Sequence, residues 1–426
     1  MNTNTNPPPP LPPPGSANFV AWVGLDWGHT AHAFAWQDRS GHAEEGTLPH
    51  SAESLHAWLR QLAERFGGQP IALGIEASRG PVIAALVQYP WLTIYPINPV
   101  TSARYRRAFV PSGAKDDTPD ARLLLELVRD HAAKLRPLQP QDELTRTLLG
   151  LVQARRDLVD RRTQVLNQLT SLLKTYYPQA LQLVGQLNTE LAADFLTRWP
   201  DLLTLKAARP GVIKRFYHAH NLRRPELLEA RLTLIRQAVA LTTDPALVQV
   251  AVWQLCCLIE QWRVFHKHIA RLDTAIKTTF RQHSEAALFR QLPGAGPALS
   301  PRLCVAFGTV RTLYPDPASL QKQAGVAPVR EKSGHQLWTH WRWQAPTFLR
   351  QSFVEWAGQT VVYSAWARTY YQHQIARGKS HQNVLRALAF KWIRVLWKCW
   401  QARTPYDEAR YLQQLRKRKS PHAVAA

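Results

Sequence analysis

The chain of 426 residues has few cysteines, and few acidic residues relative to basic ones. Its four cysteines form no Cys-x-x-Cys pair, which argues against a cysteine-rich zinc site and against a disulfide framework. Aspartate and glutamate number 30 against 53 lysines and arginines, so the formal net charge is +23. An excess of this size is typical of proteins that bind a polyanion. Nucleic acid is the first candidate partner, and an anionic membrane surface is the second.

Long apolar runs are also lacking. Outside the proline-rich start, the longest stretch without a charged residue is 80–103, and four prolines interrupt it. A continuous membrane-spanning helix is therefore not expected. The first residues carry no lysine or arginine before the prolines of 7–14, and no apolar segment with a cleavage site follows. We therefore predict a cytoplasmic protein without a signal peptide or membrane anchor.

The first part of the chain has the pattern of an α/β domain. Residues 1–17 are low in complexity and are predicted to form a disordered, proline-rich arm. From 18 to 137, three short apolar runs separated by turns precede a helical run that starts after Ser51. Strand and helix patterns then alternate. The order of three strands, helix, strand, helix, strand and helix predicts a mixed sheet.

The region 138–286 has almost no strand pattern and is predicted to be a helical connector. Every seventh residue is apolar at Leu151, Leu158, Val165 and Leu172, as along one seam of a coiled coil. The companion positions of that seam are occupied by Leu148, Arg155, Arg162 and Leu169. A coiled coil and a helix that packs on one side with its cations exposed fit this pattern equally well.

Residues 287–426 are predicted to form a mainly helical C-terminal domain with a basic tail. The segment from Arg342 to Lys419 contains 15 lysines and arginines against three acidic residues. Nucleic-acid binding is therefore predicted to concentrate here. Tryptophans are interleaved with these cations, and they fit either stacking on unpaired bases or packing in a helical core.

Four carboxylates in the α/β region form a candidate metal site. Asp26 lies in the first predicted strand and Glu76 ends the fourth, while Asp117 and Asp120 stand at the start of the closing helix. Carboxylates buried on apolar strands are costly unless they are paired or bound to a metal, and hard cations such as Mg²⁺ prefer oxygen ligands. For the two helix-start residues, capping is the alternative interpretation. Asp116 is the alternative to Asp117 as a ligand in this candidate site.

The motifs VGLDWG, GIEASRG, INPVTSARYRR and KDDTPDARLLLEL occur in this order. Together with LPGAGP and GKSHQNVLRALAFKWIRVLWKCW, they resemble the DEDD insertion-sequence transposases, which are bridge-RNA-guided recombinases with an RNase H-like, RuvC-like catalytic domain. The resemblance covers the chain from Phe19 almost to its end. It departs at Pro119, inside the acidic motif, in the extra N-terminal arm and in the longer helical middle.

The resemblance implies roles for particular residues. Asp26, Glu76, Asp117 and Asp120 match the acids that bind Mg²⁺ in that family. Ser333 of REKSGHQ matches the nucleophilic serine, although its composition alone indicates a turn serine. The glycines of LPGAGP resemble the hairpin of a helix-hairpin-helix, whose amides hold phosphate, or else a simple turn between helices.

The activity implied is that of a DNA transposase that cuts and exchanges strands through a serine–DNA covalent intermediate. Its implied partners are donor DNA, target DNA, a structured guide RNA and further copies of the chain, as a dimer or tetramer. Two alternatives stay open. One is a RuvC-like nuclease that uses metal-activated water, and the other is a nucleic-acid-binding scaffold without catalysis, which would have no use for four acids.

Overall fold

The computed structural model describes residues 18–109, 117–334, 336–342, 345–420 and 422. The chain forms two compact units, Met1–Pro140 and Gln141–Ala426, and each is described by itself. The predicted proline-rich arm, Asp116 and the side chain of Asp117 lie outside the described residues. Within the described ranges, no helix is both long and apolar enough to span a bilayer.

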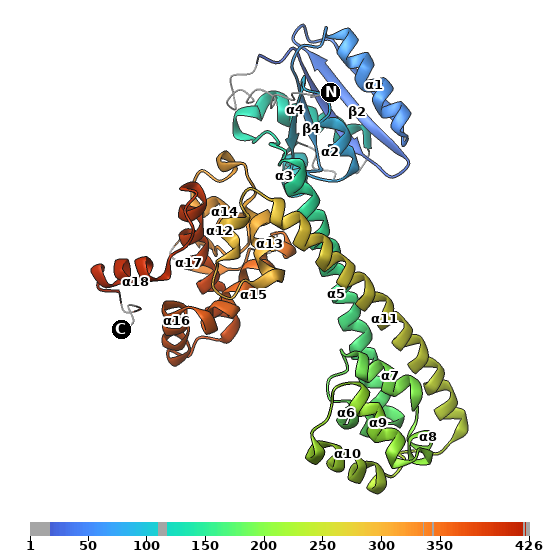
Figure 1. Cartoon of the computed structure of the whole chain (residues 1–426). Helices are drawn as coiled ribbons and strands as arrows, with labels where there is room; N and C mark the ends of the chain where they lie inside the picture. The colour runs from blue at the N-terminus through green and yellow to red at the C-terminus, as the bar shows by residue number, and fades with distance from the viewer. Residues whose placement is uncertain (1–17, 110–116, 335, 343–344, 421, 423–426) are drawn as a thin grey trace, which may run out of the picture. The chain divides into compact units, whose positions relative to one another are not determined.

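The first unit alternates strands and helices as the sequence predicts. In chain order its elements are β1 (Ala21–Trp27), β2 (Ala31–Asp38), β3 (Ala43–Pro49), α1 (Ala52–Arg65), β4 (Ile71–Ile75), α2 (Pro81–Leu86), β5 (Leu92–Pro96), α3 (Pro99–Phe109) and α4 (Asp117–His131) (Figure 1). A short 3₁₀ turn, Ala132–Lys134, follows α4. Of the helices of this unit, α3 is the one that the sequence patterns did not predict.

The strands form one mixed sheet in the order β3-β2-β1-β4-β5. The pairs β1–β2 and β2–β3 are antiparallel, as short turns between consecutive strands require. The pairs β1–β4 and β4–β5 are parallel, because a helix carries the chain back before each new strand. The predicted mixed sheet is confirmed, and β1 and β4 are neighbours although about fifty residues separate them.

Helices cover both faces of this sheet. On one face, α1 and α2 pack leucine and tryptophan side chains against β1, β2 and β4. On the other face, α4 packs against the central strands through Ala121, Leu124, Leu125 and Val128. All five residues of β4, Ile71–Ile75, are buried, since this strand has a helix on each side.

The second unit is mostly helical. Its elements are α5 (Glu143–Tyr176), α6 (Gln179–Val184), α7 (Glu190–Arg198), α8 (Leu202–Ala207), α9 (Pro210–Ala219), α10 (Pro225–Gln237), α11 (Pro245–Gln282), α12 (Ala286–Arg290), α13 (Gly296–Phe307), α14 (Pro317–Gln323), β6 (Val329–Ser333), β7 (Gln336–His340), α15 (Thr347–Tyr363), α16 (Ala365–Ala376), α17 (His381–Gln401) and α18 (Glu408–Lys417). A 3₁₀ turn spans Arg311–Leu313.

Two long helices, α5 and α11, run antiparallel and belong to two hydrophobic cores (Figure 1). The start of α5 and the end of α11 join α12–α17 in one core, whereas the end of α5 and the start of α11 join α6–α10 in the other. The boundary predicted at 286/287 falls at the start of α12, and both long helices contribute to both cores.

The predicted seam of α5 needs correction. Leu151, Leu158 and Leu172 are only half-buried. The buried positions of the helix are Thr145, Leu148, Val152, Val165, Leu169, Leu173 and Tyr176. A straight helix of 3.6 residues per turn drifts away from a strict seven-residue repeat, and short helices cover part of its length. Arg155 of the companion seam pairs with Asp273 on α11, so this part of the α5–α11 interface carries an ion pair.

Candidate active site

Two glycines, Gly24 on β1 and Gly74 on β4, let α4 approach the sheet closely. They are partners in the parallel register of these strands. A Cβ atom on Gly24 would collide with the carbonyl oxygen of Ala121, and one on Gly74 would lie 2.7 Å from that of Leu124. Any side chain at these two positions would therefore push α4 away from the sheet.

We expect Gly24→Ala to destabilise the first unit by about 1–3 kcal/mol, because the added methyl group overlaps the backbone of α4. The melting temperature, followed by circular dichroism, measures this effect. The control is Gly150→Ala in α5, where an added Cβ meets nothing within 4 Å and alanine favours the helix by up to about 1 kcal/mol. Equal melting of the Gly24 variant and the wild type would disprove the close packing of α4.

Asp26 and Glu76 each lie two residues beyond these glycines. Side chains alternate along a strand, so Asp26 shares the α4 face of the sheet with Gly24. Glu76 directly follows β4, next to the strand that carries Asp26. The structure therefore places the two carboxylates at the same end of neighbouring parallel strands, as the sequence predicts.

The predicted burial of these two acids is wrong for Glu76. Asp26 is half-buried and Glu76 is exposed. The strand β4 ends at Ile75, so Glu76 lies just outside the sheet, where its side chain faces solvent. Because Glu76 is exposed, it does not need to be paired or bound to a metal in the way that a buried carboxylate does.

The direction of α4 brings its first turn to the same end of the sheet. Ala121, near its start, packs on Gly24, whereas Arg129, near its end, donates a hydrogen bond of 2.5 Å to Gln37. Gln37 pairs with Trp22 at the opposite end of β1. Asp120, which precedes Ala121, consequently lies at the edge occupied by Asp26 and Glu76.

Helix α3 binds two of these carboxylates. The Ser102 hydroxyl donates a hydrogen bond to Glu76, and the Arg106 guanidinium forms an ion pair with Asp120. Ser102 is buried, and the side chains of Arg106 and Asp120 are 20% and 13% exposed. Ser102 and Arg106 are four residues apart, so they lie on one face of the helix. Their spacing inside INPVTSARYRR is the signal that could have identified them from sequence.

The acids of this edge are the oxygen donors that hard divalent cations prefer. Within the described residues, however, no three His, Cys, Asp or Glu side chains converge on a point that would suit a metal ion. Glu76 and Asp120 instead point to their α3 partners. The side chain of Asp117, the first residue of α4, belongs to the part of the chain that is not described.

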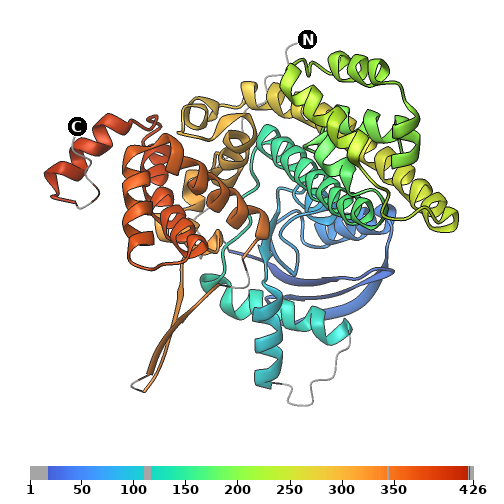
Figure 2. The ribbon, with the colours of Figure 1, turned by 90° about the horizontal axis from the view of Figure 1, so that it is seen from below.

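Ser333 is the last residue of β6, at the tip of a β-hairpin. It pairs with Gln336, and Gly334 adopts the positive φ of +57° that a two-residue turn needs. The Ser333 side chain is exposed. Figure 2 shows this hairpin extending away from the helices of the C-terminal part. The hydroxyl is therefore presented at the end of a projecting element.

The one acid of the hairpin strands is already bound. Glu331 accepts hydrogen bonds of 2.8 Å from His340 Nε2 and 2.9 Å from Trp338 Nε1. The bond from His340, followed by that from Trp338, lowers the pKa of Glu331. Arg330 and Lys332 flank it, and neither has an ion pair among the described residues. The strand that carries Ser333 is thus cationic.

Three arginines, Arg342, Arg350 and Arg386, gather near the base of the hairpin. The guanidinium of Arg386 lies over the ring of Trp341. Burial and the nearby charge of Arg350 lower the pKa of Arg386 to about 10. Nitrogen atoms of Arg342 and Arg386 are buried without a hydrogen-bond partner in the described structure. An anion would compensate this positive charge.

Most tryptophans of the C-terminal part pack in its core. Trp392 contacts both Trp356 and Trp366, and all three are almost fully buried. Trp338, on the hairpin, is 44% exposed. Core packing is confirmed for these three, whereas Trp338 is accessible to a ligand.

The LPGAGP segment joins α12 to α13. Gly294 and Gly296 have φ of +68° and +55°, so the turn depends on glycine at both positions. An open hollow of about 710 Å³ adjoins this turn, and Lys277, Arg281 and Arg290 line it. These cations are compatible with the predicted phosphate-binding turn, and a plain connection between helices remains the alternative.

Comparison with known proteins finds transposase families for both the α/β region and the C-terminal part of the chain. A transposase family model, that of the DEDD transposases of IS110, matches residues 23–178. A second, for transposases of the IS116/IS110/IS902 family, matches residues 286–372. The chain belongs to the IS110/IS116 family of transposases. It is therefore a DNA recombinase, and the two matched ranges include Asp26, Glu76 and Asp120 in one and Ser333 in the other.

Relatives of this transposase match it over nearly its full length. A mini-circle protein of Streptomyces coelicolor, assigned as the transposase of IS117, is 29% identical over 92% of this chain and 97% of its own. The 43.6 kDa protein of insertion element IS110 from the same organism is 25% identical over 91% and 95%. The 44.8 kDa protein of IS116 from Streptomyces clavuligerus is 26% identical over 88% and 93%.

Proposed function

We propose that this transposase cuts and rejoins DNA through a covalent serine–DNA intermediate, with Ser333 as the nucleophile. The observation that carries the proposal is the exposed hydroxyl of Ser333 at the tip of a projecting hairpin. Its cationic neighbours Arg330 and Lys332 have no acidic partner in the described structure. Such a hydroxyl is accessible to a DNA phosphate, and the positive charge of the strand that carries it attracts the DNA backbone.

The proposed step is a phosphoryl transfer. The Ser333 oxygen forms a bond to phosphorus and loses its proton, while the bond from phosphorus to one sugar oxygen breaks and that oxygen takes up a proton. The product is a phosphoserine diester and a free sugar hydroxyl. Attack by the hydroxyl of another strand reverses the step, so the strands are rejoined without an external energy source.

We propose Asp26, Glu76, Asp117 and Asp120 as the ligands of Mg²⁺. When bound, the ion supplies positive charge that stabilises the transferring phosphate. The fit rests on the chemistry of the donors and on the position of Asp26, Glu76 and Asp120 at one end of the sheet. Ser102 and Arg106 hold Glu76 and Asp120 at this edge, and Arg106 offsets the charge of Asp120.

The remaining features of the proposal follow from family resemblance and charge. The mixed sheet, with three antiparallel strands followed by parallel ones, supports a RuvC-like domain. The net charge of +23 supports binding of donor DNA, target DNA and a structured guide RNA. We further propose a cytoplasmic homo-oligomer, a dimer or a tetramer, in which the acids and Ser333 meet within one chain or between protomers.

Trapping the covalent intermediate tests this function. Labelled donor DNA is incubated with the full chain, the guide RNA and Mg²⁺ or chelator, and denaturing gels are run with and without protease. We expect a shifted band that depends on Mg²⁺ and disappears with protease. Cut DNA with free ends and no attached protein would instead support the hydrolytic alternative, a RuvC-like nuclease with a metal-activated water.

A further inference from the structure

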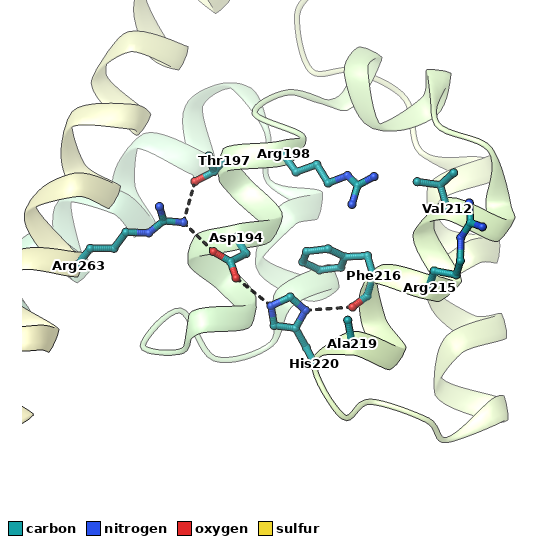
Figure 3. Close-up of a pocket in the computed structure, with 9 residues that line it drawn as sticks. All are labelled: Asp194, Thr197, Arg198, Val212, Arg215, Phe216, Ala219, His220 and Arg263. Atoms are coloured by element: carbon teal, nitrogen blue, oxygen red, sulfur yellow. Dashed lines mark hydrogen bonds and ion pairs between the residues drawn. The ribbon is translucent and has the colours of Figure 1, made fainter.

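An open hollow of about 500 Å³ lies among α7, α9 and α11 (Figure 3). This helical core contains neither Ser333 nor the proposed Mg²⁺ ligands. Phe216 forms part of its wall and packs on Phe195 and Trp199, with ring centroids 5.8 and 5.1 Å away. These aromatic residues are buried, so the wall behind the hollow is rigid and apolar. The hollow itself is open, and the side chains of Arg198 and Arg215 are exposed to solvent.

The one acid of the hollow, Asp194, is already bound by two neighbours. One carboxylate oxygen accepts a hydrogen bond of 2.7 Å from Arg263, and the other lies 3.0 Å from His220 Nε2. The second ring nitrogen of His220 lies 3.0 Å from the carbonyl oxygen of Phe216. Both partners of the ring accept hydrogen bonds only, so both contacts form together only when His220 is protonated.

The pKa of His220 has the direction that this geometry requires. Burial lowers it, but the hydrogen bonds to the Phe216 carbonyl and to Asp194, together with the charge of Asp194, raise it above the usual value for histidine. Asp194 thus offsets one of the two positive charges that Arg263 and protonated His220 carry. Neither Arg198 nor Arg215 has an ion pair with Asp194 in the described structure.

Two further arginines of the hollow, Arg198 and Arg215, have no counter-charge. In Figure 3 they extend from α7 and α9 on the side of the hollow away from Asp194, and no dashed line reaches them. In the described structure, neither of these two arginines forms a hydrogen bond or an ion pair through its side chain. The guanidinium of Arg198 lies over the ring of Trp199. Lys214, next to Arg215 on α9, differs because its amine binds Glu229 at 2.6 Å.

This pattern selects an anion with several oxygen atoms. Two unpaired guanidinium groups from different helices, at an apolar wall, match a phosphate better than a metal ion or an apolar ligand. Phosphate groups are also what the DNA substrate of a transposase supplies. We propose that this hollow binds a phosphodiester of nucleic acid through Arg198 and Arg215, as a contact additional to the proposed catalytic residues.

The test compares the double variant Arg198→Gln/Arg215→Gln with the wild type in salt titrations of nucleic-acid binding. Each phosphate contact adds roughly 0.9 to the slope of log K against log salt on duplex DNA, and roughly 0.7 on single strands. We expect the slope to fall by about 1 to 2 and the affinity at moderate salt to drop at least about tenfold. Arg198→Lys/Arg215→Lys, which keeps the charge, should recover most of the slope.

The control is Lys214→Gln/Arg236→Gln, which removes two positive charges from the same helical core. Lys214 is paired with Glu229 and Arg236 lies on α10 outside the hollow. This control should leave the slope close to that of the wild type. An unchanged slope and affinity in the Arg198/Arg215 variant would overturn the proposal, as would an equal loss in the control. Circular dichroism verifies that each variant is folded.

Separate titrations with duplex DNA, with a structured RNA hairpin and with inorganic phosphate as competitor identify the source of the phosphate. A loss of affinity in the variant that is confined to one nucleic acid assigns the site to that nucleic acid. If millimolar phosphate binds the wild type but the variant binds both nucleic acids as the wild type does, the proposal is contradicted. The inference does not depend on Ser333. At low salt and saturating DNA, the Arg198/Arg215 variant should still form the covalent adduct if the proposed function is correct.

Discussion

Ser333→Ala is expected to abolish both strand cleavage and the covalent protein–DNA adduct. No other hydroxyl stands at the tip of this hairpin, where Ser333 is exposed between cationic residues and Gly334. DNA binding should stay within about twofold of the wild type, because the cations are unchanged. Ser333→Cys should keep at most a trace of activity, since sulfur is larger and bonds less well to phosphorus. Denaturing gels with and without protease measure both products.

Thr339→Ala is the matched control, because Thr339 is an exposed hydroxyl on β7 of the same hairpin. It should cleave DNA and form the adduct like the wild type. Efficient cutting by Ser333→Ala with free DNA ends would exclude a serine nucleophile. The same result would promote the hydrolytic alternative, in which the hairpin only contacts DNA.

Asp26→Asn is expected to lower strand cleavage by at least about 100-fold while nucleic-acid binding stays nearly intact. The carboxylate lies at the end of β1 beside β4, in the proposed Mg²⁺ site, whereas phosphate contacts depend on the cations. An amide has nearly the same size as a carboxylate and lacks its charge, so the fold should be preserved. Single-turnover cleavage and a binding titration in the same salt separate the two effects.

The control for Asp26 is Glu44→Gln on β3, which removes one negative charge from the same sheet. Glu44 is half exposed and pairs with Arg65 of α1. This variant should cleave at close to the normal rate. Retained cleavage in Asp26→Asn would remove Asp26 from the site, and weakened DNA binding in that variant would indicate a structural role.

The sheet could be predicted because its strands are short apolar runs bounded by turns. The turn between the second and third of these runs, for example, joins β2 to β3 and has Gly41 at a positive φ of +89°. Helix α3 could not, since the TSARYRR run has few apolar residues and lacks a clear hydrophobic face. Its contacts with α4 and with the carboxylates of Glu76 and Asp120 are tertiary, and a local pattern does not show them.

The site was only partly predictable for a related reason. Strand order places Asp26 beside Glu76, and a pattern of alternating strands and helices is sufficient to expect it. The exposure of Glu76 depends on the residue at which β4 ends, and such ends are the least predictable feature of a strand. The position of Ser333 at a hairpin tip could be inferred from Gly334, but its projection from the helices could not.

The antiparallel pairing of α5 and α11 makes the distance between the two helical cores adjustable by length alone. These helices have 34 and 38 residues, and each residue adds about 1.5 Å along the axis. Removing seven residues from both, about two turns, would bring the Arg198/Arg215 hollow some 10 Å closer to the core that carries the hairpin, with the same helix faces still in contact. Insertion elements that differ in the length of this pair would thus engage nucleic acid at points set further apart or closer together, with unchanged chemistry at either end.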